Sequence, residues 1–162
     1  MTNDSPATVG RLRDIVVRNA SRGPMQQRER AELAPGRGIV SDLRGTSHRE
    51  VTLISRELWD DVQQELGVAL PWHSRRANLL IEGIDFGHLI GHCLSIGPCR
   101  VEILGETDPC ARMDEIHPGL WDALRPAVRA GVWGAVLEGG VVRVGDPVGC
   151  AMGSDVLDSE AQ

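Results

Sequence analysis

The chain contains no lysine and no tyrosine, so arginine supplies every fixed positive side-chain charge. Acidic residues outnumber the arginines, and the net charge of -6 at pH 7 argues against a surface that follows nucleic-acid phosphates. No apolar run is long enough to cross a bilayer, and the first ten residues lack the apolar segment of a signal peptide. We therefore expect a cytoplasmic protein with neither a nucleic-acid nor a membrane partner.

Motifs for nucleotide and acyl-transfer chemistry are also missing. The sequence has no G-x-G-x-x-G loop, no P-loop and no G-x-S-x-G nucleophile elbow. His88, His92 and Cys93 have the spacing of a metal site, but Gly91 between them breaks the helix that would align the two histidines. The four cysteines therefore remain as candidates for the chemistry of this chain.

Short segments with β-branched or alternating apolar residues dominate the 162-residue chain, which is long enough for one domain with a real core. They predict strands over residues 9–18, 28–34, 50–54, 78–81, 93–96, 100–103, 131–137 and 141–144. Because 19 glycines mark the corners between strands, we expect a mainly β fold, a closed or partly open β-barrel. Gly139-Gly140 predicts a hairpin between the last two strands.

Two or three short helices should accompany the strands. One begins after the N-cap residue Ser55 and ends at Gly67, a second ends near Pro126, and residues 84–89 form a helical turn. For domain organisation, we expect a flexible tail over residues 1–8, a barrel domain over residues 9–151 and an acidic, disordered tail over residues 152–162.

Cys110 is the cysteine best placed for chemistry. It lies in the polar loop 106–112, where Arg112 can stabilise a thiolate while Glu106 and Asp108 oppose one. The alternative is a buried packing residue, because free cysteine behaves as a small hydrophobe. That alternative is the expected role of the other cysteines, which are Cys93, Cys99 and Cys150.

Arg76 and Asn78 lie at the start of a predicted strand, in which alternate residues point to the same face. A guanidinium beside a carboxamide suits a phosphate or the edge of a pterin-like ring. A surface arginine and a turn asparagine are the alternative, and only proximity to Cys110 separates the two interpretations.

In chain order, five segments resemble the MOSC domain, a family named for the C-terminal domain of molybdenum cofactor sulfurases. The segments are Gly38–Asp42, Arg49–Ile54, Arg76–Asp85, Pro109-Cys110 and Gly139–Asp146. The resemblance covers residues 9–148, rests on the ordered set, and implies a β-barrel of the MOSC or pyruvate-kinase-barrel type.

This resemblance implies binding of the molybdenum cofactor (molybdopterin, a pyranopterin) or carriage of sulfur. Cys110 matches the family's key cysteine and would be a molybdenum ligand or a persulfide acceptor. The candidate cofactor-binding residues are Arg76, Asn78, Arg49, Thr52, Asp42 and Arg112. The chain departs from the family at Ser41-Asp42-Leu43-Arg44, where a Gly-Asp pair followed by histidine is usual.

Three functions follow as alternatives: a cofactor-binding or sulfur-carrier module, a molybdenum-dependent reductase of N-hydroxylated compounds, and a non-catalytic interaction domain. The chain lacks the aminotransferase-like domain of the sulfurases and the extra barrel of the larger reductases. The implied partners are a pterin cofactor or small-molecule substrate and, through the family's association with pyridoxal phosphate, a cysteine desulfurase or a molybdoenzyme.

Overall fold

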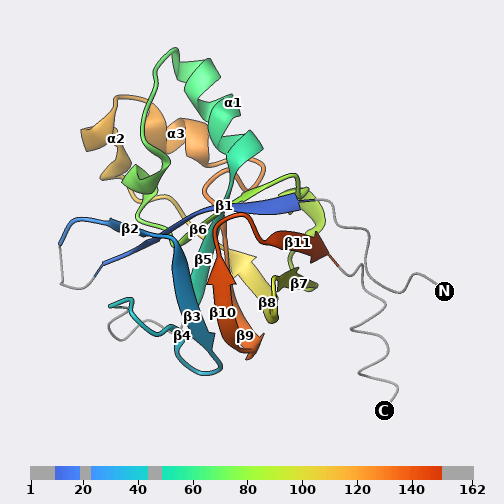
Figure 1. Ribbon diagram of the computed structural model, residues 1–162. Coiled ribbons are helices and arrows are strands. Elements are labelled where there is room, and N and C mark those ends of the chain that lie inside the picture. Colours follow the sequence, from blue (N-terminus) through green and yellow to red (C-terminus); the bar gives the residue numbers. More distant parts are fainter. Residues whose placement is uncertain (1–9, 19–22, 44–48, 151–162) are drawn as a thin grey trace.

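Figure 1 shows the computed structural model, which describes residues 10–18, 23–43 and 49–150. The tails predicted at residues 1–8 and 152–162 lie outside the described residues. Seven strands form a closed mixed barrel, as the sequence predicts, because β1 pairs with both β6 and β11. In ring order they are β1 (Gly10–Val17), β11 (Pro147–Cys150), β7 (Cys93–Ile96), β8 (Cys99–Glu106), β9 (Val132–Glu138), β5 (Val51–Ser55) and β6 (Leu79–Glu82).

The remaining strands lie beside this ring. β2 (Gln26–Arg28) extends β1, while β10 (Gly140–Arg143), β3 (Arg30–Ala34) and β4 (Gly38–Ile39) form a small separate sheet. The predicted hairpin at Gly139-Gly140 is wrong, because β9 pairs with β5 and β8 whereas β10 pairs with β3. A Cβ on Gly139 would strike the Leu33 carbonyl, and Gly140 has φ +154°, so these glycines let the chain leave the barrel rather than fold back on it.

Side chains along the barrel strands alternate between two cores. Leu53 and Leu79 point into the barrel and are completely buried there. Ile54 and Leu80, the next residue in each strand, point outward and are buried beneath the helices. β5 and β6 therefore carry nearly continuous apolar runs, since both of their faces are covered.

Three α-helices and two 3-10 turns complete the described chain, and Figure 1 shows the α-helices gathered on one side of the barrel. They are α1 (Arg56–Leu66), α2 (Met113–Ile116), α3 (Leu120–Leu124), η1 (Trp72–Arg75) and η2 (Phe86–His88). The helix between Ser55 and Gly67 is confirmed, whereas α2 is missing from the sequence prediction. No described helix combines the length and the apolar composition that a membrane span requires.

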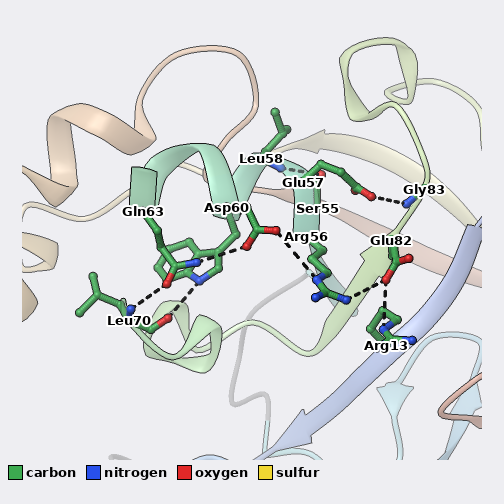
Figure 2. A network of polar contacts seen from close by, with 11 residues as sticks. Arg13, Ser55, Arg56, Glu57, Leu58, Asp60, Gln63, Leu70, Glu82 and Gly83 are labelled. Atoms are coloured by element: carbon green, nitrogen blue, oxygen red, sulfur yellow. Dashed lines mark hydrogen bonds and ion pairs between the residues drawn. The ribbon is translucent and has the colours of Figure 1, made fainter. Parts of the chain in front are cut away.

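Polar contacts fix the start of α1 to the end of β6 (Figure 2). Glu57 Oε2 accepts a hydrogen bond from the Gly83 amide at 2.9 Å, and Arg56 pairs with Glu82 at 2.9 Å. Ser55 caps the helix, as predicted. These contacts hold the C-terminal end of β6, so the segment before β6, with η1 and Arg76, lies at the opposite end of the strand.

Candidate functional site

Cys110 lies in the loop that joins β8 to α2, and it is the one exposed cysteine of the described chain. The loop is anchored at its start by Thr107, whose amide donates to the Gly131 carbonyl at 2.9 Å. At its end the Met113 amide donates to the Cys110 carbonyl at 2.8 Å and begins α2. The Cys110 sulfur accepts the Arg112 amide at 3.4 Å. The thiol is thus accessible while its backbone is held in place.

The other three cysteines pack in or against the cores, as the sequence predicts. Cys93 and Cys99 are buried and Cys150 is partly buried. Burial raises the pKa of the Cys99 thiol, and the charge of Asp146 raises it further. Burial likewise raises the pKa of the Cys150 thiol. The thiols of Cys99 and Cys150 therefore stay protonated at neutral pH and are poor nucleophiles.

Cys110 opens into a hollow of about 630 Å³, which we call the Cys110 hollow. Its lining comes from the end of β1, from η1 and from α2 with the loop before it. The lining residues are Arg18, Ser74, Arg76, Cys110, Arg112, Met113, Glu115 and Ile116. Three guanidiniums face one carboxylate here, although the whole chain carries a net charge of -6. The hollow is therefore suited to an anion.

Arg76 and Arg18 supply two of these charges from elements far apart in the sequence. Partial burial lowers the pKa of the Arg76 guanidinium, and the neighbouring charge of Arg18 lowers it further. The Arg76 side chain donates to the Gly23 carbonyl at 2.8 Å, and the Arg18 side chain donates to the Leu43 carbonyl at 3.1 Å. An anion between the two guanidiniums would relieve their mutual repulsion.

The predicted arrangement of Arg76 and Asn78 on one strand face is wrong. Arg76 precedes β6 and has a left-handed backbone with φ 60°, so it ends η1 instead of continuing a strand. Asn78 is buried, and its Oδ1 accepts from the amide and hydroxyl of Thr52 at 3.2 and 3.1 Å. Its Nδ2 donates to the Val16 carbonyl at 3.3 Å. Asn78 and Thr52 therefore join strands and do not line the Cys110 hollow.

Asp42 and Arg49 are also outside the hollow lining. Asp42 is buried, and its Oδ1 accepts the Arg18 amide at 3.0 Å, so it positions one of the lining arginines through the backbone. The Arg49 guanidinium lies 5.6 Å from the ring centre of Trp133, which is a cation–π contact on β9. Of the predicted residues, the structure thus brings Cys110, Arg76 and Arg112 together.

Three further residues near the hollow are absent from the sequence prediction. Arg18 directly follows β1, and a charged residue after an apolar run is a weak signal. Trp121 of α3 donates its indole N–H to the Pro109 carbonyl at 3.1 Å and so supports the loop next to Cys110. Arg75 lies behind the hollow and contacts the sulfur of Met113 at 3.5 Å. Nothing in the local sequence distinguishes Arg75 from its neighbour Arg76.

Metal binding by side chains alone is not favoured in the part of the chain that the structure describes. No group of three or more histidine, cysteine, aspartate or glutamate residues there could hold a metal ion. His88 is the last residue of the turn η2, and its ring contacts the Asp85 carboxylate at 3.9 Å. Cys110 could therefore serve as a single soft ligand to a metal that arrives with its own ligands.

Comparison with known proteins identifies similar sequences and folds. The model of the MOSC domain matches residues 40–149. None of the curated proteins compared with the chain matches it. YuaD from Bacillus subtilis superposes with a TM-score of 0.70 at 20% identity, covering 86% of this chain and 94% of YuaD.

YiiM proteins share the fold as well. YiiM from Geobacillus stearothermophilus superposes with a TM-score of 0.65 at 13% identity, covering 88% of this chain and 75% of that protein. For YiiM from Escherichia coli the TM-score is 0.64 at 15% identity, with 87% and 69% covered. At these identities the likeness extends to the fold alone.

Proposed function

The chain belongs to the MOSC domain family, and on that premise we propose that it binds the molybdenum cofactor or carries sulfur, with Cys110 as the reacting group. One observation carries the proposal: an exposed thiol shares one hollow with Arg18, Arg76 and Arg112. A nucleophilic or metal-ligating sulfur next to an anion site is what both activities require.

The residues of the hollow fit the cofactor by their chemistry. A thiolate is a soft ligand that suits molybdenum, and the three guanidiniums suit the phosphate of a pterin. Cys110 would hold the metal while Arg18, Arg76 and Arg112 would hold the anionic part. When bound, the cofactor supplies two-electron redox chemistry, and the chain supplies binding, orientation and the apolar wall of Met113 and Ile116.

Sulfur carriage needs only the thiol and a persulfide donor. The Cys110 thiolate attacks the outer sulfur of the donor persulfide, and the S–S bond of the donor breaks as a new S–S bond forms on Cys110. The donor leaves as a thiolate, so the step needs no external oxidant. A pyridoxal-phosphate-dependent cysteine desulfurase is the proposed donor, and the arginines would stabilise the resulting persulfide anion.

An anaerobic preparation of the whole protein tests the proposal. Molybdenum and pterin are quantified, and sulfane sulfur is mapped by mass spectrometry after incubation with a cysteine desulfurase and cysteine. Cys110→Ser is compared with the wild type, and Cys150→Ser serves as the matched control, because Cys150 is a partly buried thiol outside the hollow lining.

Metal and pterin that disappear in Cys110→Ser alone would support ligation. Sulfane sulfur on Cys110 without metal would support the carrier role. Neither metal nor sulfane sulfur on the wild type, or equal labelling of the two serine variants, would refute the proposal and leave an interaction domain.

A further inference from the structure

The guanidinium of Arg75 is buried without an acidic partner among the described residues. Its Nη2 donates to the Ala130 carbonyl at 2.7 Å and contacts the Thr107 hydroxyl at 3.5 Å. Its Nη1 contacts the Met113 sulfur at 3.5 Å, and its Nε is buried with no hydrogen-bond partner there. A buried charge with only neutral partners is unfavourable unless an anion lies within electrostatic reach.

These contacts bracket the segment that carries Cys110. Thr107 begins the segment and Met113 ends it, so one side chain touches both ends of residues 107–113. The Ala130 carbonyl joins them, because it accepts both the Thr107 hydroxyl and Arg75 Nη2. One guanidinium therefore joins η1, the cysteine segment and the turn that precedes β9.

Arg75 and Cys110 also interact electrostatically. Burial lowers the pKa of the Arg75 guanidinium, and the charge of Cys110 acts in the opposite direction. Arginine remains protonated even so, because its ordinary pKa lies far above neutrality. Among the described residues, Cys110 is the ionisable group whose charge favours this buried guanidinium.

We propose that Arg75 is a positioning residue for Cys110, holding both ends of the segment 107–113 and placing a positive charge behind the wall of the Cys110 hollow. The inference rests on the proposed function in that Cys110 is taken as the reacting group. It adds a fourth guanidinium to the three that line the hollow. Arg75 acts through the thiol and not by touching a substrate, since it is absent from the hollow lining.

The test uses two alkylating reagents that are similar in size but differ in charge. Iodoacetate is an anion and iodoacetamide is neutral, so the ratio of their second-order rates at Cys110 reports the electrostatic field at the sulfur. The rates are measured at one fixed pH on the full chain, with the modified residue identified by mass spectrometry. The variants are Arg75→Gln and Arg75→Met, which remove the charge, and Arg75→Lys, which keeps it.

We expect the iodoacetate-to-iodoacetamide ratio to fall roughly threefold or more in Arg75→Gln and Arg75→Met. In Arg75→Lys the ratio should remain within about twofold of the wild type, because the charge is retained. Arg143→Gln is the matched control, since it removes an exposed arginine of β10 outside the hollow lining, and it should leave the ratio unchanged. A merely structural role would change both rates alike and leave the ratio constant.

An unchanged ratio in folded Arg75→Gln and Arg75→Met would overturn the inference, as would an equal fall in Arg143→Gln or in Arg75→Lys. Thermal melts establish that each variant is folded. If neither neutral variant folds, Met113→Glu places a carboxylate against the guanidinium instead of removing it. The ratio should then fall further than in Ile116→Glu, which adds the same charge at the exposed rim, and an equal fall would overturn the inference.

The outcome is separable from that of the proposed function. Alkylation rates need neither a cofactor nor a sulfur donor, so the ratio can refute the role of Arg75 while Cys110 still binds metal or carries sulfur. Conversely, a protein that takes up neither metal nor sulfane sulfur could retain the Arg75 effect on its thiol.

Discussion

Asn78 and Thr52 hold together the one parallel strand pair of the barrel. The Thr52 hydroxyl donates to Asn78 Oδ1 at 3.1 Å and accepts a hydrogen bond from the backbone N–H of Asn78 at 3.1 Å. The Thr52 carbonyl accepts a hydrogen bond from the same backbone N–H. Asn78 Nδ2 reaches across to the Val16 carbonyl of β1. The single carboxamide next to the start of β6 therefore satisfies polar groups of two neighbouring strands, β5 and β1.

Replacing Asn78 with alanine should lower the free energy of unfolding by about 2 kcal/mol, because buried donors and acceptors on two strands lose their partner. Urea unfolding measures the change. Thr52→Val and the double variant complete a cycle, in which the two losses should be less than additive since the residues share their hydrogen bonds. Unchanged stability combined with altered Cys110 reactivity would contradict this structural role and indicate that Asn78 acts on the site around Cys110.

The sequence predicts what depends on neighbours in the chain. Ser55 and Gly67 bound α1 correctly because both caps are local contacts, and short apolar strands separated by glycine corners are enough to predict a barrel. Arg76 does line the hollow. It is placed there by the left-handed turn that ends η1, not by the strand that the sequence predicts. Two glycines predict a sharp turn but not which sheet the next strand joins.

The rest of the site depends on contacts that link distant segments. Arg18 reaches the hollow because β1 ends beside the start of β6, which only the strand register determines. Arg75 and Arg76 are adjacent and identical in type, yet Arg75 contacts the Met113 sulfur outside the hollow lining, whereas Arg76 lines the hollow. No periodicity separates them, because a 3-10 turn sends successive side chains in different directions.

Trp121→Phe should loosen the loop that carries Cys110. The variant keeps most of the ring packing and loses the indole hydrogen bond to the Pro109 carbonyl. Amide hydrogen exchange over residues 107–113 should accelerate about fivefold, equivalent to the loss of one hydrogen bond. Peptide-resolved mass spectrometry measures the rates.

Trp59→Phe is the matched control for this experiment. It also removes an indole hydrogen bond to a carbonyl, that of Leu70 at 3.2 Å, but at α1. Exchange over residues 107–113 should stay at the wild-type rate in this variant. Equal acceleration in both variants would show a general loss of stability and contradict a local role for Trp121.

Stability should fall at alkaline pH in part because of Cys99. Burial raises the pKa of this thiol above its ordinary value of 9.0, so the folded state keeps the proton that the unfolded state releases. The contribution of Cys99 to the free energy of unfolding is complete below pH 9.0 and is lost as the pH rises toward the folded-state pKa of the thiol. Cys99→Ala should therefore show a shallower loss of stability above that pH, measured by urea unfolding across the range.

Val101→Ala distinguishes this effect from a general weakening of the barrel. Val101 is completely buried in the same strand and carries no ionisable group. The variant should be less stable at every pH, with the alkaline slope of the wild type. A Cys99→Ala slope equal to that of Val101→Ala would show that the thiol does not contribute.

Inorganic phosphate should protect Cys110 from alkylation, because a tetrahedral anion bound between Arg18 and Arg76 would lie in the same hollow as the thiol. Arg76→Gln should weaken that protection about tenfold, as measured by the phosphate concentration that halves the iodoacetamide rate. Arg143→Gln provides the control for net charge and should leave the midpoint unchanged.

Sodium chloride at equal ionic strength separates specific binding from charge screening. Chloride screens both Arg18 and Arg76 but lacks the oxygens that would bridge the two guanidiniums, so sodium chloride should protect Cys110 far less than phosphate. Equal protection by the two salts would mean that the arginines attract anions only diffusely and that the hollow has no defined anion site.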